Sequence, residues 1–193
     1  FCVIEGRGRL LHQDPALRRP VTLCYCQPGD LVGWCGLVRH QPCEWFTSAM
    51  PLKLVGFKAE IFYELIEKSQ EFSQWLDNNN SPAEIIQALK PGLRRRPQGE
   101  PHEREVLRSL LPNLSVTSTR ELRELPKDDA VWLWNCQPSG EIVSIGEKVD
   151  PERLASIPIG ENVRLIRVDL KAWEMILNPP LESSEEVLDT SLT

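Results

Sequence analysis

The sequence predicts an α+β protein: an antiparallel β-roll (a jelly roll) with flanking helices, followed by a second, smaller β-rich block. Two observations lead to this fold class. Short β-forming segments with turn signals recur from Phe1 to about Ala49, which is typical of sandwiches and barrels. Further on, apolar residues such as Ile61, Phe62 and Leu65 change to helical spacing.

The first block contains the stronger signals. In chain order we expect strands at 1–4, 9–11, 21–26, 46–49 and 52–57, with turns at 5–8 and 28–30. The Pro28-Gly29-Asp30 turn has a clear basis, because proline presets its own φ and glycine accepts a positive one. A helical segment follows from 61 to 76, and Ser81 is placed to cap a further helix that runs to Leu89.

Residues 90–104 are rich in proline, glycine and charge, and they predict a linker between a first unit at 1–89 and a second block at 105–177. In the second block we expect a helix at 105–111, strands at 131–134, 141–145 and 163–168, a turn at 138–140 and a helix at 172–177. The segments 52–66 and 163–177 both lead from alternating apolar residues into a helix with an aromatic residue at the same offset. Two explanations stay open, a degenerate internal repeat or the general similarity of strand-to-helix junctions. The acidic tail at 178–193 is expected to be disordered or extended.

The composition limits the kind of protein. The 193 residues are 41% hydrophobic and 26% charged, with a formal net charge of −6, which is ordinary for a globular protein and argues against a nucleic-acid partner. The basic run Arg94–Arg96 is either a solvated part of the linker or a docking patch. No stretch is apolar enough to span a bilayer. The chain opens with FCVIEG, without a methionine and in what resembles mid-strand, so we expect it to be part of a longer protein.

The residues that usually carry chemistry form no recognisable site. Five of the six cysteines lie among β-forming residues before residue 44, as buried free thiols of a reducing cytosol do. The Cys24-x-Cys26 pair lacks the further ligands that a metal site needs, and the three histidines are separate: His12, His40 and His102. No phosphate-binding Gly-rich loop or Gly-x-Ser-x-Gly elbow is present. The sequence therefore predicts no catalysis, no metal and no cofactor.

The segment PGDLVGWCGLVRHQPCEWFTSA at 28–49 resembles the phosphate-binding cassette of cyclic-nucleotide-binding domains. That family has a Pro-Gly-Asp turn, a Phe-Gly-Glu-Leu-Ala motif and, shortly after, Pro-Arg-Ala. The resemblance covers about 1–76, with the first strands of such a domain absent, and implies a cyclic-nucleotide-binding-type β-roll. It places the candidate ligand pocket at Gly33, Trp34, Cys35, Gly36, Leu37, Arg39, Pro42, Cys43 and Glu44.

The departures from the family pattern fall on its ligand-binding charges. Trp34 stands where the family glutamate accepts a ribose hydroxyl, and Cys43 stands where its arginine pairs with the cyclic phosphate. Glu44 adds a negative charge beside that position. Losing a charge-assisted pair costs about 1.5–3 kcal/mol, or roughly tenfold or more in affinity. We therefore expect cyclic nucleotide not to bind.

Two neighbours of these positions leave alternatives. Arg39 is either a substitute for the missing cation or a surface residue. Trp34 and Trp45 either close an aromatic lid over another flat ligand or pack the cassette against the β-roll.

A narrower pattern, Gly33-Trp34-x-x-Leu37-x-Arg39 followed by Pro42-Cys43-Glu44, resembles the N-terminal region of cyanobacterial peptidase-containing ABC exporters of the bacteriocin and haemolysin secretion type. This implies a non-catalytic regulatory or docking module on the cytoplasmic side of a membrane protein. Its implied partners are the remaining domains of its exporter and the cargo peptide, and its implied oligomer is a homodimer through the parent protein. The alternatives are a functional sensor of cyclic nucleotide or another small ligand, and a fragment of a transcription regulator of the cyclic-AMP-receptor type.

Overall fold

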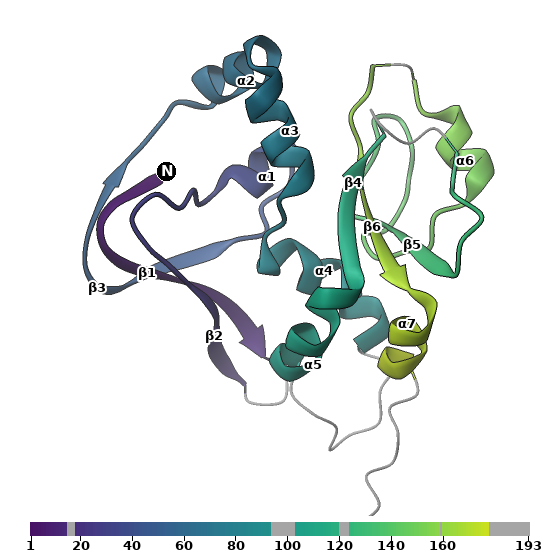
Figure 1. The fold of residues 1–193 in the computed structure, drawn as a ribbon, viewed down its shortest axis with the longest axis horizontal. Helices are drawn as coiled ribbons and strands as arrows, with labels where there is room; N and C mark the ends of the chain where they lie inside the picture. The colour runs from purple at the N-terminus through teal and green to yellow at the C-terminus, as the bar shows by residue number, and fades with distance from the viewer. Residues whose placement is uncertain (15–17, 94–102, 120–123, 159, 178–193) are drawn as a thin grey trace, which may run out of the picture.

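The computed structural model describes residues 1–14, 18–93, 103–119, 124–158 and 160–177. Within these residues the protein is α+β, with two three-stranded antiparallel sheets and helices between them (Figure 1). The α+β class predicted from the sequence is confirmed. The central part of the predicted linker, with Arg94–Arg96 and His102, and the predicted acidic tail lie outside the described residues. None of the described helices is long and apolar enough to cross a membrane.

The first sheet has the order β2-β1-β3. Its strands are β1 (Cys2–Asp14), β2 (Arg19–Cys26) and β3 (Trp45–Val55). The predicted strand at 21–26 is confirmed as β2. The Pro28-Gly29-Asp30 turn is confirmed as well: Gly29 has φ 98°, and the Asp30 N–H donates to the Gln27 carbonyl over 3.0 Å.

The expected hairpin at the start of the chain is wrong, because β1 is one continuous strand of 13 residues. Its glycines serve close packing instead of a turn. A Cβ on Gly6, where φ is +88°, would lie 1.9 Å from the Pro51 carbonyl oxygen, and one on Gly8 would lie 2.1 Å from the Phe46 ring. β3 likewise continues through Pro51, which an edge strand tolerates because its outward N–H needs no ladder partner. Register shifts near Gly6 absorb the irregularity.

Helices follow the first sheet. They are α1 (Trp34–Val38), between β2 and β3, then α2 (Ala59–Lys68), α3 (Gln70–Asn78), α4 (Pro82–Leu93) and α5 (Glu103–Leu110), with a 3-10 turn at Leu111–Asn113. The predicted cap of α4 is confirmed, since Ser81 Oγ accepts from the Ala83 N–H at 3.4 Å and Glu84 Oε1 accepts from the Ser81 N–H at 2.9 Å. This reciprocal pairing satisfies N–H groups that a helix start leaves open. α4 runs past its expected end and includes the first residues of the predicted linker.

The second sheet has the order β4-β6-β5. Its elements are β4 (Leu114–Ser118), β5 (Ala130–Trp134), α6 (Pro151–Ser156), β6 (Arg164–Asp169) and α7 (Leu170–Leu177). The predicted strands at 131–134 and 163–168 and the predicted last helix are confirmed, whereas β4 and α6 were not anticipated. β6 is the central strand here while β3 is an edge strand, so the two similar strand-to-helix segments occupy different places in their sheets.

The expected strand at 141–145 is wrong. Those residues form no ladder, and the chain returns to β5 slightly later: the Gly146 N–H donates to the Trp134 carbonyl over 2.8 Å, and the Val149 N–H to the Trp132 carbonyl over 2.8 Å. Ile142 is 90% exposed. Val143 is buried and Ile145 is partly buried, so these two apolar side chains pack against the core from a loop and not from a strand.

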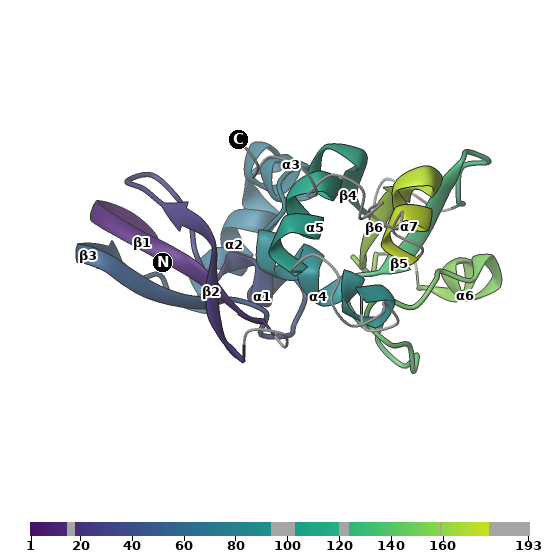
Figure 2. The ribbon, with the colours of Figure 1, turned by 90° about the horizontal axis from the view of Figure 1, so that it is seen from below.

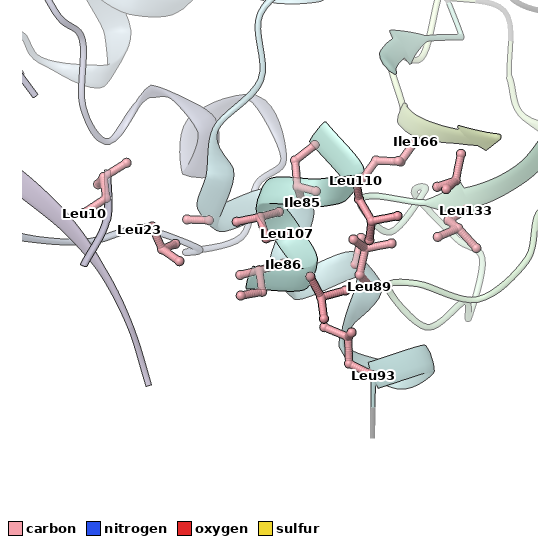
Figure 3. Packing of buried hydrophobic residues seen from close by; sticks show 14 of the residues in the cluster. Leu10, Leu23, Ile85, Ile86, Leu89, Leu93, Leu107, Leu110, Leu133 and Ile166 are labelled. Atoms are coloured by element: carbon pink, nitrogen blue, oxygen red, sulfur yellow. The ribbon is translucent and has the colours of Figure 1, made fainter. Parts of the chain in front are cut away.

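Helix α4 lies between the two sheets in both ribbon views (Figures 1 and 2). One hydrophobic core runs through it, from Leu10 and Leu23 in the first sheet, past Ile85, Ile86, Leu89, Leu107 and Leu110, to Leu133 and Ile166 in the second sheet (Figure 3). A helix that is apolar on most of its circumference is stable only when it is covered on several sides. The sequence PAEIIQALKPGL of α4 meets this condition, and both predicted blocks contribute to its cover.

Gly146 marks how closely α4 approaches the second sheet. A Cβ there would lie 2.0 Å from the Ala88 carbonyl oxygen, whereas one on Gly140 would meet nothing within 4 Å; both glycines have positive φ, at +80° and +78°. Gly140→Ala should cost roughly 1–2 kcal/mol of unfolding free energy for the left-handed backbone alone. Gly146→Ala should cost a further ~1–3 kcal/mol, because the helix must move. Urea denaturation of both variants measures this, and equal losses would contradict the close contact.

Candidate functional site

Six of the nine candidate residues surround one pocket. It has a volume of about 470 Å³ and is lined by Gly33, Gly36, Leu37, Pro42, Cys43 and Glu44, together with His40, Gln41 and Tyr63. The remaining candidates, Trp34, Cys35 and Arg39, are buried behind this wall. The segment after the Pro28-Gly29-Asp30 turn thus folds into a short helix and a loop. Six of its candidate residues form the pocket wall, and the other three are buried in the core.

The Glu44 carboxylate closes one side of the pocket. Its Oε2 accepts from the Gly33 backbone N–H over 2.5 Å, and its Oε1 accepts from the Ser81 hydroxyl over 2.7 Å. Burial raises the pKa of Glu44 above its ordinary value, although these two hydrogen bonds act in the opposite direction. A backbone N–H at the start of the cassette is therefore satisfied by an anion that belongs to the chain itself.

Arg39 is neither a surface residue nor part of the pocket wall. Its side chain is 1% exposed and reaches the second block, where Nε donates to the Asn135 carbonyl over 2.5 Å. Nη1 donates to Gln87 Oε1 on α4 over 2.7 Å. A guanidinium held by these partners is not free to bind a ligand phosphate in place of the arginine that the family pattern has at Cys43.

Trp34 packs into the core and does not form a lid with Trp45, which lies half-exposed on β3. The Trp34 and Trp75 rings meet edge to face with centroids 5.5 Å apart. The Arg164 guanidinium carbon lies 5.4 Å from the Trp34 ring centroid, within reach of a cation–π attraction. Of the two alternatives, packing of the cassette therefore applies to Trp34, and an aromatic lid does not.

A buried ion pair connects this region to the second sheet. Arg164 on β6 donates through Nη2 to Glu84 Oε1 over 3.0 Å and through Nε to Glu84 Oε2 over 3.2 Å, and both side chains are fully buried. Arg164 also donates to the Leu76 and Asn79 carbonyls, each over 2.8 Å. Burial alone would lower the pKa of Arg164, but the Glu84 carboxylate more than offsets this and raises it.

The two carboxylates and the two arginines belong to one hydrogen-bond network. Ser81 contacts both Glu44 and Glu84, and Asn135 donates from Nδ2 to Glu84 Oε2 over 2.7 Å while its carbonyl accepts from Arg39. Sequence reasoning predicted Ser81 only as the cap of α4, and it assigned no role to Glu84, Asn135 or Arg164. The available signal was a charged residue within an apolar run: Glu84 in PAEIIQAL and Arg164 in VRLIRV.

A second, apolar pocket of about 290 Å³ lies beside the first. Gly33 and Leu37 line both pockets. The walls of the apolar pocket include Trp34, Phe57, Phe62, Leu65 and Phe72. Phe57 is 50% exposed and Leu65 is 43% exposed, so the rim of this pocket presents apolar side chains to solvent.

Metal-ligating side chains do not gather in the part of the chain that the structure describes, where no group of three or more His, Cys, Asp or Glu could hold an ion. Cys24 and Cys26 lie two residues apart on β2, and each shifts the pKa of the other. The His40 ring stacks on Tyr63 with centroids 6.0 Å apart. The expectation that the chain has no catalytic activity stays a prediction.

Comparison with family models, with curated proteins and with solved structures gives no match for this chain. The resemblance of the cassette to cyclic-nucleotide-binding domains therefore stays a prediction from its motifs.

The raised pKa of Glu44 gives a testable pH dependence. A carboxyl group whose pKa is higher in the folded protein than in the unfolded chain contributes stability below the unfolded pKa, and this contribution is lost as the pH rises through the folded pKa. Glu44→Gln removes that titration. We expect the unfolding free energy of the variant, minus that of the wild type, to increase as the pH rises above about 4, the ordinary pKa of a glutamate.

Urea denaturation across this pH range measures the difference. Glu71→Gln, on an exposed position of α3, is the control. It shows how much of the change in unfolding free energy comes from removing any carboxylate. A difference that stays flat or falls as the pH rises would contradict the burial of Glu44.

Proposed function

We propose that this chain is a non-catalytic regulatory or docking module of an ABC-type peptide or protein exporter, built on a degenerate cyclic-nucleotide-binding-type β-roll. In this proposal the first sheet and the cassette are the remnant of the β-roll. The module works on the cytoplasmic side of the membrane, and the ATPase and peptidase activities belong to other domains of the parent.

The observation that carries the proposal is the self-filled cassette. Glu44 accepts the Gly33 N–H, Arg39 is tied to the second block, and Trp34 is 6% exposed in the core. A ligand phosphate would meet a carboxylate instead of a cation, and like charges at close range oppose binding. A cassette that lacks the charges needed to bind a nucleotide, but still forms a folded helix and loop, is better suited to contacting another protein than to binding a nucleotide.

The apolar pocket and its rim support the docking part. Contiguous exposed apolar surface marks protein interaction sites, and the outward face of α2 and α3 is acidic, with exposed Glu60, Glu64, Glu67 and Glu71. An apolar partner surface with basic flanks would complement it. A transcription-regulator fragment is less well supported. A helix-turn-helix needs two helices joined by a short turn, whereas strands or long loops separate α5, α6 and α7 among the described residues after α4.

The first test is isothermal titration of the purified chain with cyclic AMP, cyclic GMP and cyclic di-GMP. We expect no binding heat at ligand concentrations of about 1 mM, where the standard free energy of binding would be only about −4 kcal/mol. A cyclic-nucleotide-binding domain that keeps the family glutamate and arginine serves as the positive control. Micromolar binding would show that the chain is a working second-messenger sensor and would overturn the interpretation of Trp34, Cys43 and Glu44.

The docking part is tested by a pull-down of the chain with the remaining domains of its parent exporter and with the cargo peptide. Leu65→Ser on the apolar pocket should reduce retention several-fold, because a docked apolar anchor contributes about 1.5–3 kcal/mol. Met175→Ser, at an exposed position on α7 beside the second sheet and away from α2 (Figure 1), should leave retention unchanged. No association with either partner, together with normal export after deletion of residues 1–177, would contradict the proposal.

A further inference from the structure

Two cysteines meet at the cassette pocket. Cys35 lies on α1 and Cys43 lies in the loop between α1 and β3, and each thiol shifts the pKa of the other. Both belong to the apolar cluster that also contains Trp34 and Val38.

The two thiols differ in access. Cys35 is 0% exposed, while Cys43 is half-buried and lines the wall of the cassette pocket with Glu44 and Gln41. A small polar oxidant that enters the pocket therefore reaches Cys43 first and meets Cys35 only through it. This is the arrangement of an attacking and a resolving cysteine.

A cation lies beside the accessible thiol. The charge of the Arg39 guanidinium acts on the Cys43 thiol, and Arg39 Nη2 has no hydrogen-bond partner among the described residues. The hydrogen bond from Cys35, followed by the charge of Arg39, lowers the pKa of Cys43, whereas burial raises the pKa of Cys35. The thiolate is the nucleophile in cysteine oxidation, so the accessible thiol is also the activated one.

We propose that Cys43 and Cys35 are a redox modification site that a hydroperoxide converts into a disulfide. The Cys43 thiolate attacks one peroxide oxygen, the O–O bond breaks and hydroxide leaves, which gives a sulfenic acid. The Cys35 thiol then attacks the Cys43 sulfur, the S–O bond breaks and water leaves. Two thiols and one hydrogen peroxide thus give one disulfide and two waters; sulfur is oxidised by two electrons and the peroxide is reduced by two.

The bond would change the cassette locally. It would join α1 to the start of β3 across the loop that carries Arg39 and Pro42, and it would remove the thiolate beside the Arg39 guanidinium. Disulfides in a reducing compartment are usually transient and redox-sensing, and a bond at a half-buried pocket wall is accessible to reductant again.

The experiment uses the chain with Cys24→Ser and Cys26→Ser, because those two thiols form the competing pair on β2. Trypsin cleaves after Arg18, Arg39 and Lys53, so residues 19–39 then carry only Cys35 and residues 40–53 carry only Cys43. After treatment with hydrogen peroxide, we expect mass spectrometry of the non-reduced digest to show these two peptides joined, with the loss of two hydrogen atoms. Dithiothreitol should separate them.

Two further variants identify the order of events. Cys35→Ser should leave a sulfenic acid on Cys43 that dimedone traps, while Cys43→Ser should abolish both the linked peptides and the adduct. The wild-type chain is treated and digested in the same way, so that the result does not depend on whether the variants fold correctly. Absence of the 35–43 bond in both the wild type and the Cys24→Ser/Cys26→Ser chain, or dimedone labelling of Cys35 ahead of Cys43, would overturn the proposal.

Discussion

The Glu84–Arg164 ion pair is the interaction on which the arrangement of this protein depends. Both side chains are fully buried, and removing two charges from water costs several kcal/mol per ion unless geometry and further hydrogen bonds compensate. Here the compensation is extensive: Arg164 reaches two helix-end carbonyls besides the carboxylate, and Glu84 also accepts from Ser81 and Asn135. Each of these partners must be in place for the pair to be tolerated. The pair therefore specifies where α4 lies against β6 far more narrowly than apolar contact could.

The same helix makes the first sheet and the second block one packed body. Its apolar residues enter a core that both sheets share. Its polar residues bind the two buried arginines: Glu84 accepts from Arg164, and Gln87 accepts from Arg39. A displacement of the cassette helix α1 would pull on Arg39 and, through Asn135, on the end of β5. Because packed interiors transmit strain rather than absorb it, an event at the cassette would be felt in the second block. This coupling gives a docking or regulatory module a physical route between its two ends.

Local chemistry made part of this structure predictable. The turn at Pro28-Gly29-Asp30, the cap at Ser81 and the strands β2, β5 and β6 each follow from residues within a few positions of one another. The failures have distant causes. The glycines of β1 look like a turn until Pro51 and Phe46 are seen against them. Arg39 looks like a surface or ligand-facing residue until its partner, 96 residues further along the chain, is known. Six of the nine cassette residues line one pocket, but the motif could not predict which side chains turn away from it.

The residues that depart from the cyclic-nucleotide-binding pattern have structural roles in this protein. Trp34 packs against Trp75 and beneath Arg164, and Glu44 satisfies both a backbone amide and the Ser81 hydroxyl that begins α4. A glutamate in place of Trp34 would bury an unpaired charge in the core, and removing Glu44 would leave Gly33 and Ser81 without their acceptor, each at a cost of about 1–3 kcal/mol or more. Single substitutions that would bring this segment closer to the cyclic-nucleotide-binding pattern therefore carry a cost in stability, because Trp34 and Glu44 already make contacts that hold the cassette against the rest of the protein.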